Sequence, residues 1–329
     1  SLAPIFLYSV WLYGWRPVAI MAVSVVLGTL TEWAFERTRK KKVSEAVLVT
    51  AALFGMAMPP ATPLWVIAVG IVFATAMGKG VYGGFGRNIF NPAITGRLFV
   101  YISFPLLVQS TWMVPGGFGT RGINGVDGVS TATPLEILGG ATGTGSSGLL
   151  DLFFGMRVGS IGESAIFLIL AAAVYLIWTK TANWRMIVSS FLAGTLATVG
   201  FYAFGLIDGM SPAGLGIAGH TSNVLSYLMS GSFMYIVVFM TTDPVSAPNK
   251  PLAQWMYGIL IGSVSMLIRT FSGFPEGTSF AILIGNTFAS LLDEISPAPK
   301  KKKKKAKPAA TGKADAQAGS KAGSKEAVA

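Results

Sequence analysis

Residues 186–207 read MIVSSFLAGTLATVGFYAFGLI, an apolar run that contains no charged side chain. A run of about 20 apolar residues is long enough to cross a bilayer as a helix. On either side of this segment the chain contains nine further apolar runs of uneven length. The candidate spans are residues 1–14, 18–35, 45–58, 64–78, 89–108, 163–179, 186–207, 223–240, 253–270 and 278–292. The sequence therefore predicts an all-α polytopic membrane protein with about ten transmembrane helices.

The composition supports a membrane protein and excludes several other classes. Of the 329 residues, 52% are hydrophobic and 12% are charged, whereas soluble domains carry about 25% charged residues. The absence of Cys excludes disulfides, thiolate zinc sites and cysteine-ligated iron–sulfur clusters. The single His, His220, excludes a bis-histidine haem held by this chain alone, and we expect it to be a surface loop residue without a partner His or Cys for a metal site.

Most of the net charge of +11 lies at the C-terminal end of the sequence. From Lys300 onward there are 10 Lys against Asp315 and Glu326, a net charge of +8, and the other residues carry only +3. A tract of Lys, Ala, Pro, Gly and Ser cannot bury enough apolar surface to fold. We therefore predict a membrane domain at residues 1–295 and a disordered Lys-rich tail at residues 296–329, and no nucleic-acid partner.

The Lys and Arg residues predict which loops face the cytoplasm. If the loop at residues 37–42 is cytoplasmic, the alternation of loops places most other basic residues on the same side, as the positive-inside rule requires. Those residues are Lys79, Arg87, Lys180, Arg185, Lys250 and the ten Lys of the tail. Residues 109–162 then form a periplasmic loop of a bacterial inner-membrane protein, and the tail contacts anionic lipid from the cytoplasm. Because residue 1 is Ser rather than Met, we expect N-terminal residues to be missing.

Two stretches of the sequence are similar to each other. Pro63-Leu64, Gly70, Gly84-Phe85, Gly96 and Phe99 align with Pro251-Leu252, Gly258, Gly273-Phe274, Gly285 and Phe288. Five predicted helices separate the copies, so the second copy would be inverted in the membrane, as in transporters built from inverted repeats. We expect two inverted five-helix repeats. The alternative is a chance similarity, because Gly and Pro are common in membrane helices.

The predicted periplasmic loop contains the segment VDGVSTATPLE at residues 126–136. Three hydroxyl side chains precede a helix start at Pro134, so one interpretation is an ordinary capping turn. The other is a phosphate site, because the N-terminus of a helix favours an anion. Gly-rich stretches on both sides would allow a bulky group to approach the backbone.

This segment resembles the flavinylation motif of the family that contains the Rnf D subunit and the Nqr B subunit. Members of that family are membrane subunits of ion-translocating flavoprotein oxidoreductases. The resemblance implies covalent FMN, attached by a flavin transferase as a phosphoester of Thr133, with Asp127, Ser130 and Ala132 in register. Thr131 departs from the family, which usually has Gly at that position, while the acceptor residue is intact.

Five further segments resemble the same family, in the same order along the chain. They are residues 59–65 (PPATPLW), 82–93 (YGGFGRNIFNPA), 159–164 (GSIGES), 242–247 (TDPVSA) and 274–277 (FPEG). Each segment is weak evidence by itself. Together with the flavinylation motif they extend the resemblance over nearly the whole predicted membrane domain.

Asn88 and Asn91 lie at the predicted cytoplasmic edge of the bundle. Asn91 followed by Pro92 is a good helix start, and capping accounts for much of this pattern. A side-chain amide can also donate and accept hydrogen bonds at once, which suits the edge of a flavin ring. The resemblance implies a non-covalent riboflavin at Asn88 and Asn91.

Glu45, Asp243 and Asp293 lie at the predicted cytoplasmic ends of spans, where a carboxylate is either functional or simply solvated or capping. Acidic residues at the matching positions of the family are linked to ion translocation. The resemblance therefore makes these three residues candidates for a sodium or proton pathway. Glu163 and Glu276, at the predicted outer edge, are weaker candidates.

The resemblance implies a membrane electron-transfer subunit, with FMN and riboflavin as its redox centres and without catalytic residues or metal ligands of its own. We expect a ferredoxin:NAD oxidoreductase of the Rnf type, and the alternative is the Nqr-type membrane component of a sodium-translocating NADH:quinone oxidoreductase. The partners would be other subunits of that complex, including a second flavinylated subunit. Two other functions remain open, a channel or transporter for small uncharged solutes and a structural membrane scaffold.

Overall fold

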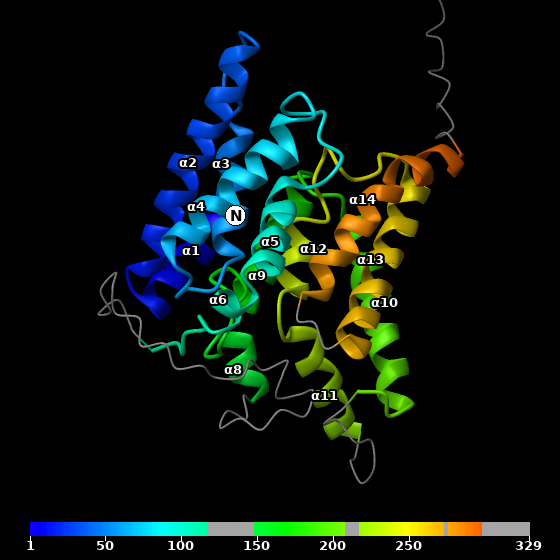
Figure 1. The fold of residues 1–329 in the computed structure, drawn as a ribbon. Coiled ribbons are helices and arrows are strands. Elements are labelled where there is room, and N and C mark those ends of the chain that lie inside the picture. The colour runs from blue at the N-terminus through cyan, green and yellow to red at the C-terminus, as the bar shows by residue number, and fades with distance from the viewer. Residues whose placement is uncertain (117–147, 208–216, 273–275, 298–329) are drawn as a thin grey trace, which may run out of the picture. The chain divides into compact units, whose positions relative to one another are not determined.

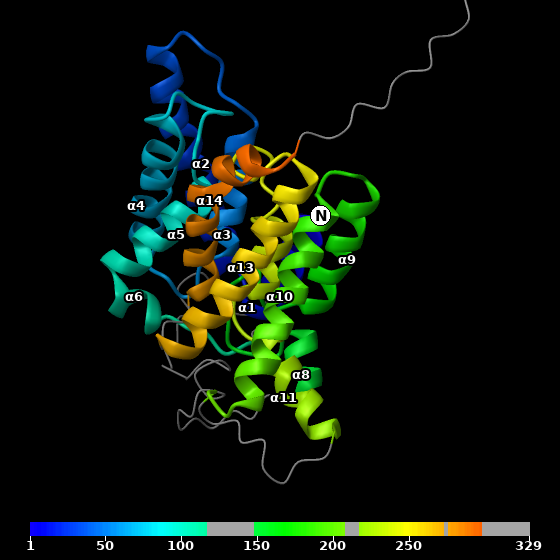
Figure 2. The same cartoon turned by 90° about the vertical axis from the view of Figure 1, so that its right-hand side faces the viewer.

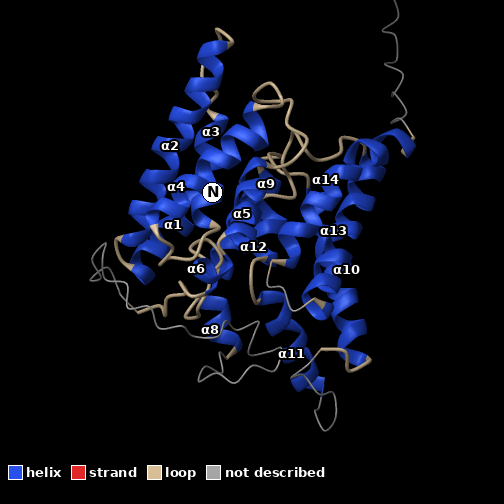
Figure 3. Cartoon of the chain, in the orientation of Figure 1, coloured by secondary structure: helices blue, strands red, loops and turns tan. Residues whose placement is uncertain are grey.

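The computed structural model describes residues 1–116, 148–207, 217–272 and 276–297 (Figure 1). All of these residues belong to one unit, Ser1–Pro297. Within the described ranges every regular element is a helix and none is a strand (Figure 3). The predicted all-α class is confirmed.

Helices occur in each of the predicted spans. Before residue 117 they are α1 (Leu2–Tyr13), α2 (Arg16–Thr38), α3 (Ala46–Met56), α4 (Leu64–Thr75), the π-helical turn η1 (Ala76–Gly80), α5 (Pro92–Ser103) and α6 (Pro105–Gln109). After residue 147 they are α8 (Leu149–Phe154), α9 (Ile166–Trp178), α10 (Trp184–Ala203), α11 (Ile217–Met229), α12 (Phe233–Phe239), α13 (Pro251–Phe271) and α14 (Gly277–Ile295).

Only some of these helices are long enough to cross a membrane unaided. By length and apolar composition, α2, α10 and α13 qualify among the described residues. The bent pair of α11 and α12, which differ in direction by 57°, would add a fourth span. Four shorter apolar elements are 10–17 residues long, namely α1, α3, α9 and α4 together with η1. The number of ten spans therefore remains a prediction.

The short helices end where the backbone cannot continue as a helix. Pro59 and Pro60 follow α3, and Pro105 separates α5 from α6, because proline lacks the N–H that the next turn needs. Gly231, between α11 and α12, has φ 64°, a conformation that glycine adopts without strain. Non-helical backbone inside a membrane protein is tolerated where protein groups satisfy it. Here the carbonyl groups at the end of α3 accept from Ile161 N and Gly162 N.

Glycines allow α4 and α5 to pack closely. A Cβ atom at Gly96 would lie 2.9 Å from the carbonyl oxygen of Gly70, so a larger residue would push the helices apart. In the second half of the chain, a Cβ atom at Gly285 would lie 2.9 Å from the Tyr257 ring. Gly96 and Gly285 are aligned in the predicted repeat, which itself remains a prediction.

Large apolar side chains cover much of the outer surface of the bundle. Trp178, Leu196 and Phe204 are 80%, 72% and 82% exposed, respectively. Exposure of so many large apolar side chains is unfavourable in water and normal for helices that contact lipid. The surface therefore fits a protein embedded in a membrane.

The two ends of the bundle differ in charge. In Figures 1 and 2 the C-terminal ends of α2 and α14 lie at the upper end, and α6, α8 and α11 lie at the lower end. The turn after α2 carries Arg39 and Lys40–Lys42, and Arg39 donates to the carbonyl oxygen of Gly80, just before the loop that carries Arg87. Arg39, Lys40–Lys42 and the loop that carries Arg87 thus lie at the same end of the bundle, as the positive-inside rule predicts.

Candidate functional site

A cavity of about 540 Å³ lies between the N-terminal parts of α1, α3 and α5, the turn η1 and the segment that follows α12. Its wall is mainly apolar, with polar groups at a few positions. Three residues that the sequence analysis selected lie in this wall, Asn88, Asn91 and Asp243. The fold therefore brings together side chains that are far apart in the sequence.

Asn91 acts as the N-cap of α5. Its Oδ1 accepts from Ala93 N at 3.0 Å and from Ile94 N at 3.4 Å, and Pro92 is the first helical residue. Its Nδ2 donates to Met240 O at 3.4 Å. The capping alternative is thus confirmed, and most of the hydrogen-bonding capacity of Asn91 is used within the protein.

Asn88 retains capacity for a ligand. Its side chain is 7% exposed, and its Nδ2 donates to Phe90 O at 3.1 Å. Among the described residues no donor reaches its Oδ1. An amide oxygen in a cavity wall that no protein donor reaches is a natural acceptor for an N–H group of a bound molecule.

Asp243 lies in a turn beyond the end of α12. Its carboxylate accepts from Val245 N at 3.2 Å and from Ser246 Oγ at 2.8 Å. Burial raises the pKa of Asp243, and the hydrogen bonds from Ser246 and from the backbone lower it again in part. The carboxylate is therefore easier to protonate than a solvated one, which suits a group that binds and releases a cation.

The other two acidic candidates are not in the wall of the cavity. Glu45 is exposed at the N-cap position of α3, and its side chain makes no capping hydrogen bond. Asp293, near the end of α14, accepts from Asn249 N and Lys250 N, both at 2.8 Å. Asp293 thus ties the end of α14 to the start of α13, as the capping alternative predicts.

The predicted FMN segment cannot be placed. Thr133, Asp127, Ser130 and Ala132 lie outside the described residues. Their roles therefore remain those that the sequence predicts.

The sequence analysis missed a buried ionic cluster around Arg97 on α5. Arg97 Nη2 lies 2.8 Å from Glu163 Oε1 and 2.6 Å from Glu276 Oε1. The side chains of the three residues are only 1–3% exposed. Glu163 and Glu276, which the sequence places at the outer edge of the membrane, have side chains buried inside the protein, where each needs a cation. A lone Arg in the apolar run 89–108 was the signal that pointed to this cluster.

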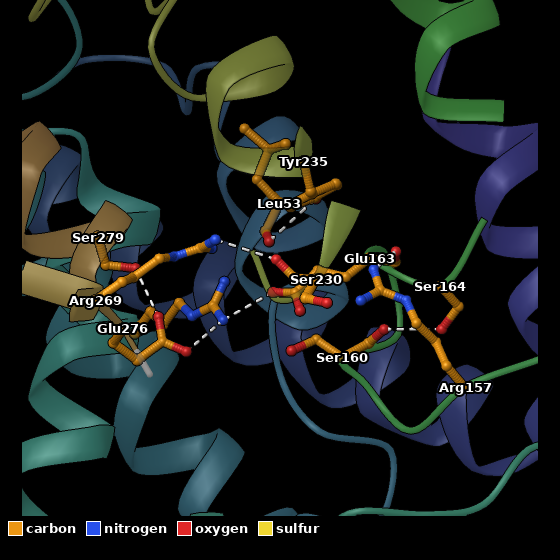
Figure 4. Close-up of polar contacts among 11 residues, drawn as sticks. Leu53, Arg157, Ser160, Glu163, Ser164, Ser230, Tyr235, Arg269, Glu276 and Ser279 are labelled. Carbon is orange, nitrogen blue, oxygen red and sulfur yellow. Dashed lines mark hydrogen bonds and ion pairs between the residues drawn. The ribbon is translucent and has the colours of Figure 1, made fainter. Parts of the chain in front are cut away.

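Further polar groups surround this Arg97 cluster (Figure 4). Arg157 Nη2 donates to the carbonyl oxygen of Glu163 at 2.9 Å, and Ser279 Oγ donates to Glu276 Oε2 at 2.8 Å. Arg269 Nη1 donates to Ser230 O at 3.1 Å, at the break between α11 and α12. The Arg97 cluster therefore joins α5 to the N-terminus of α14 and to the segment before α9.

A second buried ion pair was also missed. Lys79 Nζ, on η1, lies 2.7 Å from Glu32 Oε2 on α2, and the two side chains are 3% and 4% exposed. Lys79 lines the cavity. The sequence analysis treated Lys79 only as a marker of sidedness, although a Lys inside an otherwise apolar stretch indicates a buried partner.

The expectation for His220 was wrong in one respect, because His220 lies on α11 rather than in a loop. Its Nδ1 is 2.8 Å from the hydroxyl of Tyr202 on α10. The sequence analysis did not predict this contact, because it joins two helices and leaves no pattern in the local sequence.

Helices long and apolar enough to cross a membrane, shorter apolar helices beside them and ion pairs buried in the interior fit a multi-pass membrane protein. The chain belongs to the NQR2, RnfD, RnfE family, whose sequence profile matches residues 1–301. The resemblance noted from the motifs is thereby confirmed.

Individual relatives agree with the family assignment. The chain is 36% identical over 281 residues to the B subunit of the Na(+)-translocating NADH-quinone reductase of Azotobacter vinelandii, an alignment that covers 84% of this chain and 66% of the relative. It is 35% identical over 287 residues to the corresponding protein of Pseudomonas paraeruginosa, with the same coverage. The chain thus spans 66% of the length of these relatives.

Proposed function

We propose that this chain is the B-type membrane subunit of a Na⁺-translocating NADH:quinone oxidoreductase and carries electrons on bound flavin. The observation that carries the proposal is its similarity to the B subunit of that enzyme over 281 residues. The sequence analysis ranked an Rnf-type complex first, and the named relatives favour the Nqr type instead. The Rnf type is the second candidate, because the family also includes RnfD.

The cavity fits a non-covalent riboflavin in size and chemistry. Its volume of about 540 Å³ falls within the range of about 300–1,000 Å³ that is usual for cofactor sites. Val49, Leu53 and Phe239 give it apolar walls for a flat ring, and Asn88 Oδ1 is available to accept from a ring N–H. A bound flavin would supply the redox chemistry, and the chain would bind and orient it and exclude water.

The covalent FMN is proposed at Thr133, supported by the flavinylation motif with Asp127, Ser130 and Ala132. A flavin transferase would attach it. The loop would face the periplasm and the Lys-rich tail the cytoplasm, which is the orientation that the basic residues favour. The other proposed partners are the remaining subunits of the complex, among them a second flavinylated subunit.

The flavin content of the purified chain tests the cavity site. We expect acid extraction to release riboflavin, and Asn88→Ala to weaken its binding about 2- to 10-fold, the value of one hydrogen bond. Asn183→Ala is the control, because that exposed amide at the start of α10 makes no capping hydrogen bond and is outside the cavity. A wild-type chain without extractable riboflavin, from cells that make the flavin, would contradict the proposal.

For the ion pathway we propose Asp243, together with Glu45 and Asp293. Asp243→Ala is expected to lower the number of ions moved per electron in vesicles that contain the whole complex, because it removes a carboxylate from the cavity wall. The flavin content of the variant should change less than this ion-to-electron ratio. Asp151→Asn, on α8 at the opposite end, is the control. If the number of ions moved per electron is unchanged in Asp243→Ala, Asp243 is a capping residue and not part of the ion pathway.

A further inference from the structure

The cavity has a cation in its wall that none of the roles above uses. Lys79 lines the cavity, and its side chain is 3% exposed. Glu32 Oε2 lies 2.7 Å from its Nζ. A buried ammonium without a partner would destabilise the fold, and Glu32 supplies the counter-charge that holds the Lys79 ammonium at the cavity wall.

The π-helical turn η1 places Lys79 at this position. Two glycines in the turn allow close packing on both sides. A Cβ atom at Gly78 would lie 2.9 Å from Pro92 Cα, and one at Gly80 would lie 3.0 Å from the Phe35 ring. Lys79 is therefore held between α2 and the start of α5. Single π-helical turns of this kind are frequent at functional sites.

The ion pair is oriented relative to the cavity. Glu32 is not among the residues of the cavity wall, and its Oε1 accepts from Ser44 N at 3.1 Å. Of the two charged residues of the pair, only Lys79 is part of the cavity wall. Lys79 Nζ also lies 5.4 Å from the centre of the Phe85 ring, which is part of the same wall.

The donor capacity of Lys79 is not exhausted by these contacts. An ammonium carries three N–H donors, and Glu32 uses one of them. Asp243 is the other charged side chain in the wall, and its carboxylate already accepts from Val245 N and Ser246 Oγ. Lys79 therefore has donors left for a bound anion, and the Asp243 carboxylate is held in place by two hydrogen bonds within its own turn.

We propose that Lys79, positioned by Glu32, makes the cavity bind the reduced, anionic form of a flavin ring more tightly than the oxidised, neutral form. This inference rests on the proposed function. The oxidised ring takes up two electrons and one proton and then carries one negative charge. A nearby cation stabilises that charge and raises the reduction potential of the bound ring.

The test compares two binding constants and needs no turnover. Riboflavin, oxidised or reduced by anaerobic dithionite, is titrated into flavin-depleted protein that carries Thr133→Val, so that no covalent flavin contributes to the signal. The decisive variant is Lys79→Met combined with Glu32→Gln. It removes both charges and so leaves no unpaired carboxylate in the interior. Lys250→Met is the matched control, because it removes a Lys that is outside the cavity wall.

In the control and in Lys79→Arg we expect the reduced form to bind more tightly. In the double variant the preference should fall by about tenfold, which corresponds to about 30 mV for a two-electron couple. If the double variant and the control both bind riboflavin and prefer its reduced form equally, the role of Lys79 is overturned. The proposal of a flavin cavity would then still stand. Failure of the unsubstituted cavity to bind riboflavin in either form would overturn the flavin cavity itself, and this inference with it.

Discussion

Arg97→Ala is expected to destabilise the bundle by about 3–5 kcal/mol, the cost of removing one partner from a buried ionic cluster. In the unsubstituted protein Glu163 and Glu276 both pair with Nη2 of Arg97. The substitution leaves these two carboxylates in the interior without that cation. Since folded proteins are stable by only about 5–15 kcal/mol in total, we expect a large loss of folded protein. The measurement is the unfolding midpoint in detergent, together with the yield of monodisperse protein.

Two further variants separate charge from side-chain volume. Arg87→Ala removes an exposed Arg and should change the midpoint little. Arg97→Met combined with Glu163→Gln and Glu276→Gln removes all three charges and should recover much of the lost stability, because no unpaired carboxylate remains. If Arg97→Ala is as stable as Arg87→Ala, the cluster does not hold the bundle together.

Thr133→Val is expected to abolish the covalent flavin completely. A phosphoester needs the hydroxyl oxygen of Thr133, and Val has the same shape without it. Protein made in cells that contain the flavin transferase should show a fluorescent band on a denaturing gel, and the variant should show none. Riboflavin extractable from the cavity should be unchanged, because its proposed contacts involve other residues.

Thr131→Val is the control for this experiment. It removes a neighbouring hydroxyl, at the position where the sequence departs from the family, and should keep the fluorescent band. A band that survives in Thr133→Val and is lost in Thr131→Val would move the acceptor to Thr131. A colourless wild-type band from cells with the transferase would refute the covalent FMN proposal.

Parts of the candidate site could be predicted because their cause is local. Asn91 caps α5 through the N–H groups two and three residues ahead, so Asn followed by Pro was enough to predict the helix start. Asn88 and Asp243 were also selected from the sequence. Their place in one cavity wall was not predicted, because it depends on how α5 packs against the segment after α12.

The number of spans could not be settled in the same way. An apolar run such as residues 223–240 has the length of one span, and the structure divides it at Gly231 into two helices that differ in direction by 57°. Hydropathy measures transfer into lipid and is insensitive to a break whose backbone groups are satisfied inside the protein.

The sequence by itself determined the helical membrane class, the basic end of the bundle and the family. The class and the basic end follow from the composition of continuous segments, and the family follows from motifs within them. None of these properties depends on which segments pack against each other in space. Tertiary structure alone decided the ion pairs. Arg97 meets Glu163 and Glu276 across 66 and 179 residues of chain, and Lys79 meets Glu32 across 47. The physical reason is that a charge inside an apolar bundle must find its counter-charge wherever the packing of helices places one, and no local pattern records that distance.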